Sequence, residues 1–495
     1  MKKKYIWLVI PIILFVFLND LIINNKIPLA SDMVAHEPIK EWLSTTSEFP
    51  HWFPNLFSGL PAYGGYISTQ GHPLQPLLNT LYLNNGVKFW LYLSIGGISL
   101  FFLLKFLRVS YIASLFGGIA YALTPYVFGL INAGHNNKIM AGAFTPLLLL
   151  CALYMFSNHT IKSILLLSIV SALQLWTNHP QIYYYTWIVI GLWWLVDTMH
   201  CLIKNKINFK KTIKDIVFLT ISIIISLLMV SDPYYDIYKF QSKSNRGSIS
   251  VLDQTDDTKK GTSWDYATQW SFHPLETISF IYPYYYGLQN FSVKNKSEPK
   301  KFMKQASYWG YMPFTQSTHY LGLLIVILSF FSLWYYFRYK EQNSSEVILW
   351  IISFIILVIG FGSHLPLFYK PLFKFAPFFS KFRVPSMIYM MLSLTMPMIA
   401  AISMDKIINE KYKKEIFSNS LKVFGVFIIS SIILFMFGES LLSFSSAGDN
   451  RFIHYIGIVK DIRLELFNKG ILLALLICFG AVTLIFLYSK NRISK

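Results

Sequence analysis

Charged residues are scarce in this chain of 495 residues. Only 14% are Asp, Glu, Lys or Arg, whereas 54% are hydrophobic. A soluble globular domain carries about 25% charged residues and roughly 45–50% apolar ones, so this composition excludes an ordinary soluble protein. The apolar residues also gather in long runs, which predicts a helical membrane protein that crosses the bilayer many times.

The chain has few cysteines and lacks the common nucleotide-binding and catalytic motifs. The cysteines, Cys151, Cys201 and Cys478, lie in or beside apolar segments without metal-ligand spacing. We interpret them as small hydrophobic residues in helices and infer no disulfide framework. The chain has no P-loop, no convincing glycine-rich dinucleotide fingerprint, no HExxH and no GxSxG. No sizeable cytoplasmic domain is predicted, so any activated donor must be reached from the membrane or the outer side.

Acidic residues are few, and the balance of charge is strongly basic. Asp and Glu number 24 against 43 Lys and Arg, for a formal net charge of +19. Such a charge could indicate nucleic-acid binding, but many basic residues sit in short loops between apolar segments, where they set membrane orientation. These predicted cytoplasmic segments include residues 2–4, 105–108, 204–214, 338–340, 406–414 and 490–495. We therefore exclude a nucleic-acid partner and place both termini in the cytoplasm.

Twelve apolar segments are predicted to span the membrane, each near the roughly 20 residues that a bilayer core requires. Their approximate ranges are 5–23, 87–104, 110–131, 139–156, 162–177, 181–200, 215–231, 319–337, 347–363, 385–404, 422–438 and 470–489. The first segment follows three lysines, as in a signal peptide, but continues through Ile23 without a clear small-x-small cleavage site. We interpret it as an uncleaved first span.

The predicted outer face carries two long loops, 24–86 and 232–318, besides shorter ones such as 439–469. Loops of this length in a compact protein are usually functional. The second could instead be partly disordered around residues 294–304, which are rich in Lys and Ser. We find no internal repeat and no inverted pair of broken helices of the kind that favours a transporter.

The first outer loop begins with a compact polar group, Asp32, His36 and Glu37, directly after the first span. Carboxylates serve as general bases or as metal ligands, and the sequence allows a divalent metal there without requiring one. The alternative is a capped interfacial helix whose aromatic neighbours form a belt at the lipid headgroups. Asp20 and Asp232 are competing candidates for the base, and all of these interpretations stay open.

Three further clusters are predicted on the outer side. His135 and Lys138 could bind a phosphate at a helix start, or belong to a solvated turn. His179 and Gln181, among tyrosines, suit sugar hydroxyls or else an aromatic belt. Arg383 could clamp a phosphate with two parallel hydrogen bonds, or simply snorkel to the interface. The stretches 264–276 and 360–367 add further aromatic, His and acidic residues.

Six stretches, taken in order, resemble the YfhO-type bacterial integral membrane proteins of the GT-C glycosyltransferase superfamily. They are residues 31–38, 52–63, 134–140, 178–181, 266–276 and 382–386. The resemblance implies one all-α transmembrane domain, 1–495, with about twelve spans and short helices in the outer loops. It also implies a location in the bacterial cytoplasmic (inner) membrane. Longer relatives carry a sizeable outer domain before their last span, where this chain has only residues 439–469.

The resemblance further implies transfer of a sugar from a polyprenyl-phosphate-linked donor to a cell-envelope acceptor on the extracytoplasmic face. Asp32 matches the catalytic acidic residue of the first outer loop. The residues matched to the substrate-binding pattern are His36, Glu37, His135, Lys138, His179, Gln181 and Arg383. The competing function is a lipid-linked saccharide flippase, which predicts polar residues along a path through the membrane. Gln174 is a weak candidate for such a path.

Overall fold

The structure is a computed structural model. Its described residues are 3–26, 28, 37–47, 50, 52–54, 58–61, 77, 80–241, 243–244, 262–288, 292–294, 302–304, 307–315, 318–339, 344–409, 413–490 and 492. Helices make up nearly all of the secondary structure in these ranges. This part of the chain is therefore a helical bundle, as the long apolar runs predict.

The helices alternate between long apolar rods and short pieces. The α-helices are α1 (Val9–Phe17), α2 (Asn19–Ile22), α4 (Glu37–Ser44), α7 (Asn85–Phe106), α8 (Tyr111–Ala122), α9 (Pro125–Ala133), α10 (Asn136–Asn158), α11 (Ile161–Trp176), α12 (Pro180–Ile203), α13 (Phe209–Met229), α14 (Ser231–Gln241), α15 (Trp264–Thr268), α16 (Leu323–Tyr339), α17 (Ser344–Gly360), α18 (Pro366–Phe375), α19 (Leu392–Ile408), α20 (Lys413–Leu441) and α21 (Ile456–Ser489). The 3-10 helices are η1 (Lys3–Leu8), η3 (Pro274–Phe280), η4 (Gly362–His364), η5 (Phe379–Lys381), η6 (Pro385–Met390) and η7 (Ala447–Tyr455).

Two short antiparallel strand pairs lie in the predicted outer loops. β1 (Trp52–Phe53) pairs with β2 (Leu60–Pro61), and β3 (Ser292–Lys294) pairs with β4 (Phe302–Lys304). The second pair falls within the stretch for which disorder was one of two interpretations, and its described residues form a ladder. Helices α4, α14, α15 and η3 confirm that the two long loops carry short helices of their own.

Every predicted span coincides with an apolar helix or with two consecutive ones. In the described ranges, eight helices are long and apolar enough to cross a membrane, and four apolar helices are shorter. The shorter ones are Lys4–Phe17, Ile161–Trp176, Leu323–Tyr339 and Ser344–Gly360. The chain is thus a membrane protein whose described part holds eight long apolar helices, and the count of twelve spans stays a prediction.

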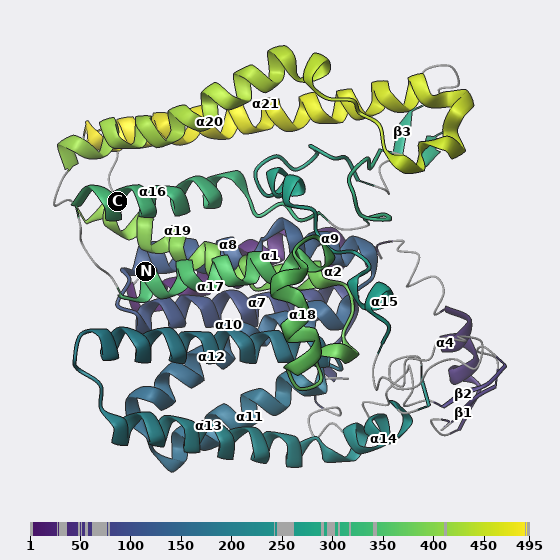
Figure 1. The fold of residues 1–495 in the computed structure, drawn as a ribbon, viewed down its shortest axis with the longest axis vertical. Helices are drawn as coiled ribbons and strands as arrows, with labels where there is room; N and C mark the ends of the chain where they lie inside the picture. Colours follow the sequence, from purple (N-terminus) through teal and green to yellow (C-terminus); the bar gives the residue numbers. More distant parts are fainter. Residues whose placement is uncertain are drawn as a thin grey trace.

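The bundle is built in layers (Figure 1). Neighbouring contacts run from α13 through α11, α10, α7, α8, α19 and α16 to the long pair α20 and α21. The pair forms one edge of the molecule, and α11 and α13 form the opposite edge. Both chain termini lie at the same end of the bundle. We call this end the inner end and the opposite one the outer end.

The centre of the bundle is η6 with α19. In the span Pro385–Ile408, 94% of the most apolar window is buried, whereas the corresponding share is 17% for α13 and for Phe417–Leu441. The peripheral helices therefore expose apolar side chains outward, which only a lipid environment makes favourable. Within the core, Ser353 donates to Thr395 (Oγ–Oγ1 2.7 Å) and Ser329 to the carbonyl of Met396 (3.1 Å), so hydrogen bonds between neighbouring helices hold α19 in place.

Residues 439–469, predicted to be a loop, are largely helical. η7 covers Ala447–Tyr455, and α21 begins at Ile456, well before the predicted span at 470. A helix of 34 residues is about 51 Å long at 1.5 Å per residue, which exceeds a hydrocarbon core of roughly 30 Å. The first turns of α21 therefore extend beyond the apolar core at the outer end.

The segment 266–276 is hydrogen-bonded at the outer end to the start of the stretch 360–386. Phe272 N–H donates to the Gly360 carbonyl (3.0 Å), and Ser363 N–H donates to Ser271 Oγ (2.9 Å). Gly362 has a φ of +52°, and a Cβ there would lie 2.2 Å from Ser271 Oγ. Only glycine fits here, because the backbone is in the left-handed region and a Cβ would clash with Ser271.

Candidate functional site

The predicted catalytic group lies mostly outside the described residues. Asp32 and His36 are not among them, and Glu37 is described only as the first residue of α4. Pro38 follows it at the second position of the helix, where proline is tolerated because that backbone N–H has no partner within the helix. The assignment of Asp32 as the base, and of a metal at Asp32 and Glu37, stays a prediction.

The competing acids are exposed. The Asp20 side chain is 59% exposed, accepts from Lys26 Nζ (2.9 Å) and takes a second hydrogen bond from Asn24 (2.7 Å). Asp232 is exposed in the first turn of α14. Both carboxylates are therefore accessible to water in the structure.

His135 and Lys138 contact each other at the outer end of α10. The chain leaves α9 through Gly134, whose φ is +79°, and His135 then precedes the first turn of α10. Lys138 Nζ lies 3.2 Å from His135 Nδ1. The pair places an ammonium group beside a helix N-terminus, an arrangement that suits an anion.

Gln181 and Arg383, which are 202 positions apart, meet at the outer end. Gln181 is buried in the first turn of α12, and its Nε2 donates to the Arg383 carbonyl (2.7 Å) and to the Tyr185 hydroxyl (2.8 Å). His179, two residues earlier, is the N-cap of α12 and accepts from Ile182 N–H (3.3 Å). The structure thus brings together Gln181 and Arg383, two of the predicted substrate-binding residues. His179 instead caps the N-terminus of α12.

The Arg383 side chain is held from one side by Tyr266. Its Nη1 donates to the Tyr266 hydroxyl (2.7 Å), and the guanidinium carbon lies 5.3 Å from the centre of that ring. Within the described part of the chain this is the guanidinium's one hydrogen bond, out of five N–H donors. Arg383 is half-buried, so donors remain to meet a ligand at the outer surface.

The backbone next to Arg383 is strained. Val384 has a φ of +61°, which is rare for any residue with a Cβ and exceptional for a β-branched one. Such a conformation costs on the order of 1–3 kcal/mol, and it is typically found at functional sites. The hydrogen bond from Gln181 to the Arg383 carbonyl and the ring of Pro385 hold this geometry in place.

Sequence reasoning missed the setting of Glu276. This residue of η3 is only 2% exposed, and it accepts from the Tyr308 hydroxyl (3.0 Å) and from Tyr311 N–H (2.7 Å). Burial outweighs these hydrogen bonds and raises the pKa of Glu276 to about 7. The residue is a carboxyl group that can exchange a proton near neutral pH, a property found often at functional sites.

A pair of neighbouring histidines contacts Tyr311, one of the residues that donate to Glu276. The ring of His273 stacks on Tyr311, with 3.8 Å between ring centroids, and the His364 ring lies 4.8 Å from that of His273. Burial lowers the pKa of both imidazoles, and His273 lowers that of His364 further. We call His273, Glu276, Tyr308, Tyr311 and His364 the outer His–Glu cluster. Segment 266–276 carries His273 and Glu276 as well as Tyr266, the hydrogen-bond partner of Arg383. This segment therefore connects the cluster to Arg383.

A buried ion pair fixes the cluster to α21. Arg463 is 1% exposed and makes two hydrogen bonds to Asp449 (2.7 and 2.8 Å). It also donates to the carbonyls of Phe444 (2.7 Å) and Tyr308 (3.3 Å). Burial alone would raise the pKa of Asp449, but the hydrogen bonds from Arg463 and Ser446 outweigh it and bring the pKa to about 2.

No family model, curated protein or solved structure matches the chain. The likeness to YfhO-type proteins rests on the six sequence stretches and stays a prediction. Among the described residues, no group of three or more His, Cys, Asp or Glu could hold a metal ion.

Proposed function

We propose that this membrane protein is a glycosyltransferase that moves a sugar from a polyprenyl-phosphate-linked donor to an extracytoplasmic, cell-envelope acceptor. In this proposal it is a GT-C-like bundle of about twelve spans in the bacterial inner membrane, and its outer end faces away from the cytoplasm. One observation carries the proposal. Tyr266 holds the half-buried guanidinium of Arg383 and Gln181 holds its backbone carbonyl, at the end of a bundle whose peripheral helices expose apolar side chains.

A lipid-linked phosphate is the ligand that this setting suits best. A guanidinium binds a phosphate with two parallel hydrogen bonds, and partial burial strengthens them because water competes less. The lipid tail of such a donor would lie along the apolar helices while its head reaches the outer end. Lys138, held beside His135 at the same end, supplies a second cation.

The reaction needs a base and a stabilised leaving group. Oxygen of the acceptor hydroxyl attacks the anomeric carbon, the bond from that carbon to the phosphate oxygen breaks, and the polyprenyl phosphate leaves with the electron pair. The hydroxyl proton passes to the carboxylate of Asp32. Arg383 holds the phosphate as its negative charge grows, and a fixed donor of this kind contributes about 10²–10³ in rate.

No observation favours the flippase. Gln174, the candidate for a polar path, is fully buried, and its Nε2 donates to the Ala141 carbonyl (2.9 Å), to Thr145 (3.1 Å) and to Thr186 (2.9 Å). These hydrogen bonds tie α10, α11 and α12 together. Hydrogen bonds of this kind between helices stabilise their packing.

The test measures donor-dependent sugar transfer by purified protein in lipid. We expect Asp32→Asn to abolish transfer, while Asp20→Asn and Asp232→Asn retain it. Arg383→Lys should lower the rate by about 100-fold, because an ammonium cannot make the paired hydrogen bonds of a guanidinium. The matched control is Arg338→Lys at the inner end of α16, which should leave the rate unchanged. Normal transfer by Asp32→Asn, or a folded wild type that consumes no lipid-linked donor, would contradict the proposal.

A further inference from the structure

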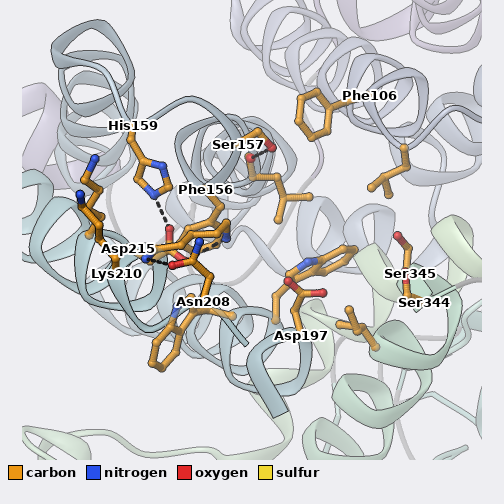
Figure 2. A pocket seen from close by; sticks show the side chains of 17 residues that line it. Phe106, Phe156, Ser157, His159, Asp197, Asn208, Lys210, Asp215, Ser344 and Ser345 are labelled. Carbon is orange, nitrogen blue, oxygen red and sulfur yellow. Dashed lines mark hydrogen bonds and ion pairs between the residues drawn. The ribbon is translucent and has the colours of Figure 1, made fainter. Parts of the chain in front are cut away.

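A cavity of about 600 Å³ opens at the inner end, opposite the candidate site. Residues of α7, α10, α12, α13 and α17 line it. Figure 2 shows His159, Asp215, Lys210 and Asn208 on one side, Asp197 beyond them, and Ser344 and Ser345 across the space. Its volume lies within the 300–1,000 Å³ typical of small-molecule sites.

One wall of the cavity is cationic and is built on a buried carboxylate. Asp215 is 2% exposed and lies 2.5 Å from His159 Nε2 and 3.1 Å from Lys211 Nζ. These contacts fix Lys211 against the wall. Lys210 and Lys214, on the same turns of α13, add two more ammonium groups to the lining. The wall therefore carries more positive than negative charge.

Hydrogen-bond donors add to the charge. The cavity lies at the N-terminus of α13, where backbone N–H groups and the helix dipole favour an anion. The indole Nε1 of Trp194, which lines the same cavity, is buried and has no hydrogen-bond partner among the described residues. Because other atoms cover that nitrogen, the indole forms part of the cavity wall and does not donate into the cavity.

A lipid can reach this site from the side. α13 is a peripheral helix, and among and just after its lysines it exposes Ile213 (61%) and Ile216 (46%). An acyl chain could follow these side chains while its headgroup enters the cavity. Across from the lysines, Asp197 and the hydroxyls of Ser344 and Ser345 suit an ammonium or hydroxyl group.

We propose that this cavity binds the phosphate of a membrane-lipid headgroup, with Lys210 and Lys214 as its cationic donors. The proposal does not depend on the proposed transferase activity. Lysines that only set orientation need no cavity between helices and no buried carboxylate such as Asp215, which holds the neighbouring Lys211 against the cavity wall. Anionic and zwitterionic headgroups are recognised by basic pockets of this kind between helices.

The experiment measures binding to the purified, delipidated full-length chain. Native mass spectrometry follows phosphatidylethanolamine and phosphatidylglycerol, and calorimetry follows inorganic phosphate and glycerophosphoethanolamine. The double variant Lys210→Gln/Lys214→Gln should weaken binding at least tenfold. Binding should also weaken as the salt concentration rises, because the lysines are exposed.

The matched control is Lys162→Gln/Lys206→Gln, which removes two exposed lysines at the same end but outside the lining. Lipid binding lost in the first double variant and kept in the control supports the headgroup site. Lysine-dependent binding of the soluble phosphates without lipid would keep the phosphate site but replace the lipid by a free ester. Equal loss in both double variants, or no loss in the first, would overturn the proposal.

Discussion

At the residue scale, burial distinguishes Glu276 from the exposed acids Asp20 and Asp232. Its carboxyl group accepts hydrogen bonds from the Tyr308 hydroxyl and from the Tyr311 backbone N–H. Among the contacts that the structure describes, it has no cation beside it. Desolvation then dominates, because it penalises the charged form by more than these hydrogen bonds favour it. A carboxyl group with a pKa of about 7 changes charge near neutral pH, whereas burial lowers the pKa of His273 and His364 below the ordinary value of 6.5.

The stability of the protein should reflect this carboxyl group. The folded pKa of about 7 lies above the ordinary value of 4.5, so the folded state binds more protons between those two pH values. The free energy of unfolding therefore falls as the pH rises through this window, by about 3 kcal/mol at most. We expect thermal melts in detergent to show that the stability of Glu276→Gln does not decrease over this pH window. Relative to the wild type, the variant should therefore become more stable as the pH rises from about 5 to about 8.

The histidines provide the internal check on that measurement. Their lowered pKa values mean that the folded state binds fewer protons than the unfolded chain, so their contribution to stability grows as the pH rises towards neutrality. This opposite contribution is common to wild type and variant and cancels in the difference. A difference that stays constant with pH would show that Glu276 keeps an ordinary pKa.

At the element scale, small residues decide how closely the helices approach. A Cβ on Gly118 of α8 would lie 2.6 Å from the carbonyl oxygen of Gly97 in α7 and 2.8 Å from Ile10 Cδ1 in α1. Three helices therefore meet at one glycine, as in other membrane bundles where small side chains let backbones touch. Gly425 of α20, by contrast, has no atom within 4 Å of its added Cβ.

These two glycines make a matched pair of substitutions. We expect Gly118→Val to destabilise the protein by on the order of 2 kcal/mol, because backbone on the facing helix cannot move aside. Gly425→Val should change stability by less than about 0.5 kcal/mol. Denaturation of both variants in the same detergent measures the contrast. Equal stability of the two would mean that α7 and α8 do not pack as closely as described.

At the scale of the whole molecule, the ends of the bundle differ in chemistry. The inner end carries both termini and the lysine-lined cavity, and the outer end carries Arg383 and the outer His–Glu cluster. The distribution of basic residues predicts that the inner end faces the cytoplasm. The proposed donor and the proposed headgroup would then bind on opposite sides of the membrane.

Labelling of single cysteines tests this orientation. In a background with Cys151, Cys201 and Cys478 replaced by Ala, Ser363→Cys lies at the outer end and Ser157→Cys at the inner end, both exposed. We expect a membrane-impermeant maleimide to label Ser363→Cys in intact cells and Ser157→Cys only after permeabilisation. The reverse pattern would place the candidate site in the cytoplasm and rule out an extracytoplasmic transferase.

The sequence by itself determined the class of the protein and the places of its apolar helices. Hydrophobicity is a local property, so each predicted span coincides with a helix in the described ranges. It predicted less well where polar residues continue a helix. Lys460, Asp461 and Glu465 indicated a loop, but α21 runs through them because Arg463 is anchored to Asp449 and the helix packs along α20.

Only the tertiary structure decided which polar residues meet. The sequence predicted Gln181 and Arg383 separately, and their contact depends on η6 folding beneath the start of α12. The pKa of Glu276 depends on Tyr308 and Tyr311 covering it, and the cavity depends on five helices ending together. Burial, pairing and cavity shape arise from segments far apart in the chain, and no local pattern of residue types records them.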